Sequence, residues 1–220
     1  MKVGTDGALL GAWAPCSENT QRVLDIGTGT GLIALMIAQR APNAHITAIE
    51  PNPDALKDAQ ANFEESPFAE RLHLMPCRLQ DFSSAEDFDL IVSNPPFYTQ
   101  GTRPEHHGRA HARHNMDLSA HQLLSSAGML AQGGRIAAIY PPEIFGDLIS
   151  LAPKLGLQLS HRCDVRPLAG KNVHRVLFSF EKNSGKSIDP KRKELIIEAD
   201  TRHSYSHEFK HLLKDYYLHL

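Results

Sequence analysis

The chain has 220 residues, of which 41% are hydrophobic, so it can bury a substantial core. No stretch approaches the ~18 consecutive apolar residues that span a bilayer, and no basic segment with an apolar run behind it opens the chain. The three cysteines lie far apart without a Cys-x-x-Cys pair, so they suggest neither a disulfide framework nor a zinc site. We therefore expect a cytoplasmic protein with no membrane partner and no metal.

Charge is distributed unevenly along the chain, although the formal net charge is only −2. Residues 1–100 carry 6 Lys and Arg against 13 Asp and Glu, whereas residues 101–220 carry 17 against 12. A polyanionic partner would therefore face the second half of the chain. Ordinary surface variation stays open as an alternative, because the excess is modest.

Apolar segments alternate with helical patterns at the spacing expected of an α/β sheet. Strands are predicted at 23–26, 45–49, 72–75, 90–92 and 135–140. Helices are predicted at 32–39, 53–63, 118–130 and 144–155, with a turn at Gly133-Gly134 after the third of them. Two further strands, 157–165 and 173–180, are joined by residues 166–171, a connection short enough for a hairpin.

The end of the chain follows a different pattern. A polar stretch over 183–193 predicts an exposed loop, 194–199 a possible extra strand, and 203–220 a helix whose apolar stripe docks on the sheet. We therefore expect one domain over 1–220, with 183–220 as a C-terminal loop and helix packed on it.

A glycine-rich turn follows the first predicted strand, with Gly27, Gly29 and Gly31 after Asp25. A dinucleotide fingerprint would need a glycine at position 32, which is Leu32, and the Gly-Lys-Ser/Thr of a P-loop is absent. The run instead resembles motif I of S-adenosylmethionine-dependent methyltransferases. The resemblance implies that the glycines let the backbone approach the cofactor and that Asp25 orders the loop and meets the cofactor's ammonium group. A turn-stabilising carboxylate is the alternative for Asp25.

Two further positions complete the expected cofactor site. Glu50 ends the second strand and suits a carboxylate that accepts hydrogen bonds from both ribose hydroxyls, with a solvated strand-end charge as the alternative. After the third strand, Asp81 is the candidate for the cofactor's adenine amino group, although the earliest position in that turn is Arg78. Phe82 would stack or pack against the same ring.

The fourth strand is followed by Asn94-Pro95-Pro96-Phe97. An adenine amine or a glutamine amide has a delocalised lone pair, so it is a poor nucleophile until acceptors fix its N–H bonds. The Asn94 side chain and the Pro95 carbonyl supply two acceptors, because Pro95 and Pro96 remove backbone donors and fix φ. Phe97 offers a flat face for a base. Together with the glycine turn, this motif predicts methyl transfer to a planar amino nitrogen.

A sheet that is parallel except for one hairpin strand resembles the fold of class I methyltransferases, an α/β Rossmann-like fold with a seven-stranded, mostly parallel sheet and helices on both faces. Beyond the fold, the chain resembles the tRNA(Val) adenine-N6 methyltransferase family. The matching runs are residues 1–13, 25–29, 66–71, 94–98 and 174–177.

The family resemblance implies methylation of the adenine 3′ of the anticodon in tRNA, giving N6-methyladenosine with S-adenosylmethionine as methyl donor. It implies that the cofactor pocket is lined by Lys2, Gly4, Thr5, Asp6, Gly7 and Asn94. Asn94 and Pro95 would hold the target amine, with Phe97 and Tyr98 against the base. A monomer is favoured. Members of this family usually carry about two dozen apolar and basic residues before the segment that here begins at Lys2, a length suited to a lid or an RNA-touching arm. Without such a segment, substrate affinity is expected to suffer.

Residues 101–115 are rich in histidine and arginine, and Arg109 and Arg113 are candidates for substrate phosphates. A mobile solvated loop is one alternative, and a metal site at His107, His111 and His114 is another. Arg175, in the predicted hairpin, suits either an RNA contact or a salt bridge at the sheet edge.

The asparagine-proline motif defines the kind of nitrogen but not the molecule that carries it. The same turn occurs in methyltransferases that act on release-factor glutamine, ribosomal RNA guanine N2 and DNA adenine. These acceptors, and a non-catalytic protein that binds S-adenosylmethionine and RNA, are the competing hypotheses.

Overall fold

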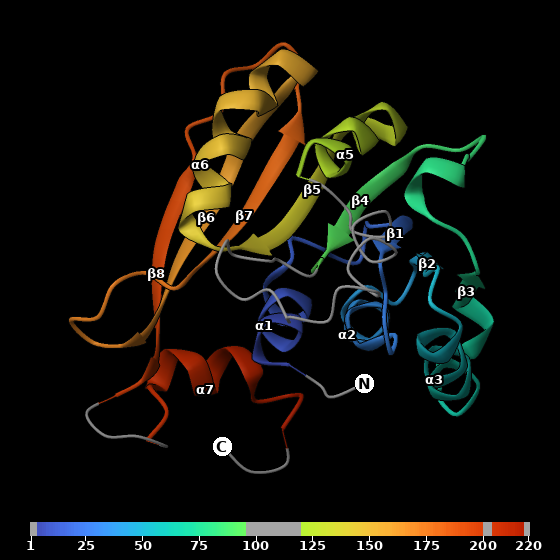
Figure 1. The fold of residues 1–220 in the computed structure, drawn as a ribbon, viewed down its shortest axis with the longest axis horizontal. Coiled ribbons are helices and arrows are strands. Elements are labelled where there is room, and N and C mark those ends of the chain that lie inside the picture. Colours follow the sequence, from blue (N-terminus) through green and yellow to red (C-terminus); the bar gives the residue numbers. More distant parts are fainter. Residues whose placement is uncertain (1–3, 96–119, 200–203, 218–220) are drawn as a thin grey trace, which may run out of the picture.

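The computed structural model describes residues 4–95, 120–199 and 204–217. They form one eight-stranded sheet with the order β3-β2-β1-β4-β5-β7-β6-β8 (Figure 1). In chain order the strands are β1 (Arg22–Ile26), β2 (His45–Ile49), β3 (Leu72–Met75), β4 (Phe88–Ser93), β5 (Leu130–Tyr140), β6 (Leu157–Leu168), β7 (Arg175–Lys182) and β8 (Lys191–Glu198).

Strands β1 to β5 are parallel, and β7 runs antiparallel to both of its neighbours, β5 and β6. The predicted class I methyltransferase fold and its hairpin are therefore confirmed. The sheet has eight strands rather than seven, because residues 191–198 pair in parallel with β6 at the sheet edge. The segment considered as a possible extra strand thus belongs to the sheet and begins three residues earlier than predicted. That the whole chain is one domain stays a prediction.

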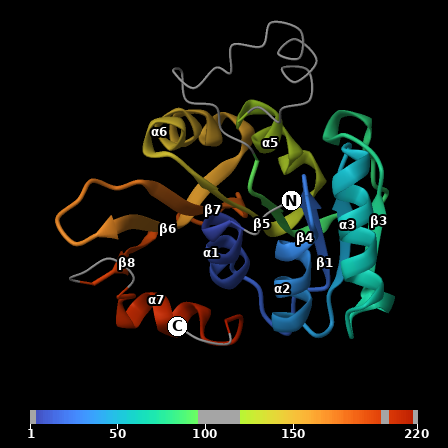
Figure 2. The same cartoon turned by 60° about the horizontal axis from the view of Figure 1, so that its bottom comes forward.

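Helices cover both faces of the sheet, as Figure 2 shows. On one face lie α1 (Thr5–Trp13), α2 (Leu32–Arg40) and α7 (His207–Leu213), and on the other α5 (Ala120–Ser125) and α6 (Pro142–Leu151). Helix α3 (Pro53–Glu64) places Phe63 in the same apolar cluster as α1 and α2. Short 3-10 turns occur at η1 (Ala69–Arg71), η2 (Leu79–Asp81), η3 (Ser126–Met129) and η4 (Ala152–Leu155).

The central strands are buried on both faces, which explains their nearly continuous apolar sequence. Along β4, Leu90 and Val92 join the cluster under α1 and α2, while Ile91 joins the cluster under α5 and α6. None of these three side chains is more than 1% exposed. The core therefore holds β4 firmly in the centre of the sheet.

Helix α1 was not predicted, because its small and apolar residues show no polar face. It packs closely on α2, since a Cβ atom at Gly11 would lie only 2.6 Å from Sδ of Met36. This close approach brings the first turn of α1 to the end of the sheet where the glycine turn lies.

Two predicted boundaries were wrong. Helix α5 ends at Ser125, and Gly133 and Gly134 lie inside β5 rather than in a turn before it. Gly133 has φ of +75°, the β4–β5 register shifts there, and a Cβ atom at Gly134 would lie 2.7 Å from the Phe88 carbonyl oxygen. The glycines thus form an irregularity in the strand.

The last helix is shorter than the predicted 203–220. It begins after Ser206, whose hydroxyl accepts a hydrogen bond from the Phe209 amide, and Phe209 and Leu213 are buried. Within the residues that the structure describes, no helix is both long and apolar enough to cross a membrane.

Candidate active site

The glycine turn after β1 is locked onto the end of β2. The amides of Gly27 and Thr28 both donate to the Ile49 carbonyl, at 2.9 and 3.1 Å. Gly27, Gly29 and Gly31 have φ of 70°, 60° and 83°, a region that side chains strongly disfavour. The alternating glycines are therefore required by the backbone of this turn.

Asp25 lies beneath this turn and is completely buried. Its Oδ2 accepts a hydrogen bond of 2.6 Å from the Thr28 hydroxyl, which confirms a turn-stabilising role. Its Oδ1 lacks a hydrogen bond of normal length among the described residues. Burial raises the pKa of Asp25 to about 7; the Thr28 hydroxyl and the nearby Ala34 amide oppose this rise, and the charge of Glu50 adds to it. A buried carboxylate oxygen that needs a donor suits a cationic group such as an ammonium.

Glu50 is buried, so the alternative of a solvated strand-end charge was wrong. Its Oε2 accepts from the Gly29 amide at 3.0 Å, and its Oε1 accepts from the Asn52 amide at 2.9 Å. Each carboxylate oxygen can accept a second hydrogen bond. Glu50 can therefore hold the glycine turn and still receive hydroxyl groups from a ligand.

Asn94 lies directly after β4, beside β1 in the sheet. The hydroxyl of Ser93 donates to the Ile26 carbonyl at 2.8 Å and so ties the end of β4 to the residue before the glycine turn. Asn94 is half-buried and Pro95 is buried. The predicted catalytic asparagine and the predicted cofactor turn therefore lie side by side.

The first turn of α1 reaches the same place. A Cβ atom at Gly7 would lie 3.7 Å from Nδ2 of Asn94 and 3.4 Å from Cδ2 of Leu32. Gly4 and Thr5 lie at the exposed start of the helix. Asp6 is already engaged within the protein, because its Oδ2 accepts a hydrogen bond of 2.7 Å from Nε of Arg175.

Asp81 and Phe82, proposed for the cofactor's adenine, follow β3. The end of β3 lies next to Glu50, because the Glu50 amide donates a hydrogen bond to the Met75 carbonyl. Asp81 is exposed, and the Phe82 ring packs on Phe88 with centroids 6.3 Å apart. The structure thus leaves Asp81 available and gives Phe82 a packing role.

Several predicted positions lie outside the described residues: Lys2, Pro96, Phe97, Tyr98, Arg109, Arg113, and the histidines His107, His111 and His114. Among the described residues, no group of three or more His, Cys, Asp or Glu side chains could hold a metal ion. Sequence reasoning did not single out Ser93 or the Thr28 hydroxyl, although both sit within or beside the motifs.

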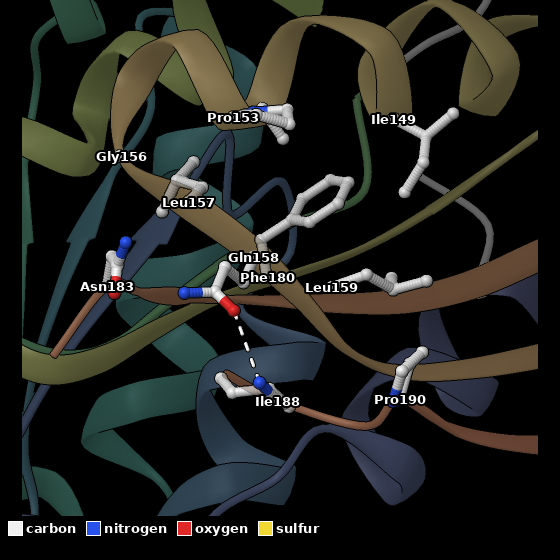
Figure 3. A pocket seen from close by; sticks show the side chains of 11 residues that line it. Ile149, Pro153, Gly156, Leu157, Gln158, Leu159, Phe180, Asn183, Ile188 and Pro190 are labelled. Atoms are coloured by element: carbon white, nitrogen blue, oxygen red, sulfur yellow. Dashed lines mark hydrogen bonds between the residues drawn. The ribbon is translucent and has the colours of Figure 1, made fainter. Parts of the chain in front are cut away.

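A hollow lies elsewhere on the molecule, away from Asn94. It has a volume of about 350 Å³ and is formed by η4, the start of β6 and the segment before β8, with Leu157, Gln158, Phe180 and Asn183 in its wall (Figure 3). The Gln158 side chain accepts a hydrogen bond from the Ile188 amide there, and none of the described residues that line the hollow is charged. Phe180 pairs with Ile136, and the Leu157–Lys182 pair lies beyond it on the side away from the carboxyl end of β5, so this hollow faces away from the end of the sheet that carries Asn94.

The comparisons with known proteins agree with this geometry. The methyltransferase small domain family model matches residues 8–139. A tRNA1(Val) (adenine(37)-N6)-methyltransferase of Parabacteroides distasonis is 42% identical over 99% of this chain and 91% of its own. The enzyme of the same name from Vibrio cholerae is 36% identical over 99% of this chain and 89% of its own. The chain belongs to the tRNA1(Val) (adenine(37)-N6)-methyltransferase family.

Membership of this family makes the protein an S-adenosylmethionine-dependent methyltransferase. Solved structures agree on the fold alone. A predicted O-methyltransferase of Agrobacterium tumefaciens has a TM-score of 0.72 at 18% identity, covering 96% of each chain. A methyltransferase of Pyrococcus furiosus has a TM-score of 0.56 at 22% identity, covering 80% of each. The buried Asp25, whose Oδ1 has no hydrogen-bond partner among the described residues, and Glu50, whose oxygens can each accept a second hydrogen bond, are acceptors that fit the ammonium and hydroxyl groups of this cofactor.

Proposed function

We propose that the protein methylates the exocyclic N6 of an adenine in tRNA, at the position 3′ of the anticodon of tRNA(Val). The observation that carries this proposal is the placement of Asn94. It leaves β4 beside the glycine turn and against the first turn of α1. An amine held there would lie next to the cofactor.

In this proposal the residues of the asparagine-proline motif bind and orient the target base. Asn94 Oδ1 and the Pro95 carbonyl oxygen accept the two N–H bonds of the amine, and the Phe97 ring stacks on the base. Fixing both N–H bonds points the nitrogen lone pair at the methyl donor. Catalysis then comes from alignment and from oriented dipoles, which contribute to rate when they are already in place.

The cofactor residues act through hydrogen bonds. Asp25 meets the ammonium group, the glycine turn admits the amino-acid part, and Glu50 accepts from the ribose hydroxyls. When bound, S-adenosylmethionine supplies a methyl group on a positively charged sulfur. Transfer of that methyl group to the oriented nitrogen would leave the electron pair of the S–CH₃ bond on sulfur, and the methylated nitrogen would lose its proton to water or to a carbonyl oxygen. No side-chain base is required.

The choice of tRNA over other acceptors is supported by the names of the full-length relatives and by the basic second half of the sequence. A base beside the anticodon lies in a loop and can be turned outwards at modest cost. With this substrate the protein would act as a monomer in the cytoplasm without a metal. Ribosomal RNA guanine and release-factor glutamine are the acceptors to be tested against it.

The test is incubation of the wild-type protein and Asn94→Ala with labelled S-adenosylmethionine and unmodified bulk tRNA, followed by nucleoside mass spectrometry. We expect label in N6-methyladenosine with the wild type and its loss in the variant. Methylglutamine or methylguanosine in parallel reactions, without methyladenosine, would refute the tRNA adenine assignment. Cofactor binding by Asn94→Ala, measured separately, shows that the variant is folded.

A further inference from the structure

An ion pair joins Asp6 of α1 to Arg175 of β7 at the end of the sheet where Asn94 lies. Nε of Arg175 donates to Oδ2 of Asp6 at 2.7 Å, although 169 residues separate them. The side chains are only 19% and 26% exposed. A charged hydrogen bond with this degree of shielding is stronger than the solvated pairs common on protein surfaces.

Arg175 is held firmly by the sheet. It is the first residue of β7, it is paired with Val165 of β6, and one of its guanidinium nitrogens donates to the His174 carbonyl at 2.9 Å. Its position is therefore set by the hairpin and not by α1. Asp6 is the partner whose place depends on the contact.

The first turn of α1 buries Gly7 and Ala8, but its exposed start is weakly capped. Its N-cap is Gly4, which makes no side-chain capping hydrogen bond. Asp6 in that turn also interacts favourably with the helix dipole. The ion pair with Arg175 is thus a side-chain contact that ties the start of the helix to β7.

The residue after Asp6 is Gly7, which backs onto Asn94. A Cβ atom at Gly7 would lie 3.7 Å from Nδ2 of Asn94, the end of the amide that does not accept hydrogen bonds. A displacement of the first turn would therefore remove the wall behind the Asn94 amide. In the proposed function, Oδ1 of that amide holds the target amine.

We propose that Arg175 is a positioning residue: through Asp6 it holds the first turn of α1 against Asn94 and so fixes the orientation of the amide that binds the target amine. The inference rests on the proposed role of Asn94. It differs from a direct contact between Arg175 and RNA, which the sequence equally allowed, because it requires Asp6 and Arg175 to act as one unit.

The kinetic test compares Arg175→Ala, Asp6→Asn and the double variant with the wild type in single-turnover methylation of tRNA. Each single change should slow the methyl-transfer step by about tenfold, because small displacements of catalytic groups are costly, and should leave KM for tRNA within about threefold. The double variant should be no slower than the slower single variant, since the two residues share one interaction. Arg175→Lys should recover part of the rate.

The matched control is Arg135→Ala. Arg135 of β5 forms an ion pair of 2.9 Å with Glu181 of β7, near the other end of β7 from Arg175. Its loss removes a comparable ion pair from the sheet and should leave the methyl-transfer rate unchanged. An equal slowing in this variant would mean that general loosening of the sheet, not positioning, explains the effect.

A different pattern would overturn the inference in favour of RNA contact. Arg175→Ala would then raise KM for tRNA and flatten its salt dependence, while Asp6→Asn would change neither. Additive effects of the two substitutions on the rate would also contradict the shared role.

A readout without turnover separates this inference from the proposed function. The side-chain amide resonances of Asn94, assigned by NMR with Asn94→Ala, should shift in Arg175→Ala and Asp6→Asn but not in Arg135→Ala. If the wild type methylates no tRNA, the proposed function fails, and the resonances still decide whether the ion pair positions Asn94. Unshifted resonances in both variants refute the inference.

Discussion

Oε2 of Glu50 accepts a hydrogen bond from the Gly29 amide at 3.0 Å, so the carboxylate proposed to bind ribose also holds the glycine turn. The predicted ribose-binding group and the glycine turn are thus linked through one side chain. Its other oxygen holds the Asn52 amide at the start of α3. Loss of this carboxylate should affect both the ligand and the loop.

Glu50→Ala is therefore expected to weaken binding of S-adenosylhomocysteine by about a hundredfold and to lower the free energy of unfolding by about 1–3 kcal/mol, because the buried Gly29 amide and the Asn52 amide lose their acceptor. Calorimetric titration and chemical denaturation measure the two effects. Glu70→Ala, at an exposed position, serves as the control and should change neither. Normal ligand affinity in Glu50→Ala would rule out the ribose contact.

The raised pKa of Asp25, about 7, predicts a particular pH dependence of stability. The native state retains this proton up to about pH 7, whereas an unfolded chain loses it near its usual value of 3.8. The contribution of Asp25 to the free energy of unfolding is therefore present below the lower value and is lost as the pH rises to about 7. Subtracting the pH profile of Asp25→Asn from that of the ligand-free wild type isolates this contribution. A flat difference between the two profiles would show that the Asp25 pKa is not raised.

Binding of the cofactor product should follow the same ionisation with the opposite trend. An ammonium group favours the charged carboxylate, so the affinity for S-adenosylhomocysteine should increase as the pH rises through about 7. The increase should be absent in Asp25→Asn. Calorimetric titrations across this pH range test the assignment of Asp25 to the ammonium, and an unchanged slope in the variant would contradict it.

Asn94→Ala should reduce the single-turnover methylation rate by about a hundredfold or more while leaving S-adenosylhomocysteine affinity nearly unchanged, because the amine contact acts mainly in the transition state. Asn94→Asp keeps both the size of the side chain and an acceptor oxygen, so it should lose less turnover than Asn94→Ala. A variant Asn94→Ala with wild-type turnover would exclude the proposed amine contact.

Gly11→Ala should destabilise the protein by about 1–3 kcal/mol, since its Cβ atom would meet Met36 at 2.6 Å and force α1 away from α2. Gly146→Ala in α6 is the matched control, because a Cβ atom there has no atom within 4 Å. It should stabilise by up to about 1 kcal/mol through helix propensity. Equal effects of the two changes in urea denaturation would show that α1 does not approach α2 so closely.

Local sequence was sufficient for most of the strands and for both motifs. The positions of Gly27, Gly29 and Gly31 reflect backbone angles that neighbouring residues determine, and the apolar run that ends at Asn94 marks a buried strand. Helix α1 escaped prediction because a helix of small, buried residues lacks the polar face on which periodicity depends. Gly133 and Gly134 predicted a turn, but their conformation depends on the neighbouring β4.

The sequence by itself determined the class of fold, the cofactor turn and the nature of the acceptor nitrogen, because each depends on residues close together in the chain. The tertiary structure decided how these parts meet. Glu50 reaches the Gly29 amide, Gly7 backs onto Asn94, and Arg175 binds Asp6 across 169 residues. Such contacts arise only when parallel strands bring their carboxyl ends to one edge of the sheet, and no local pattern in the sequence records them.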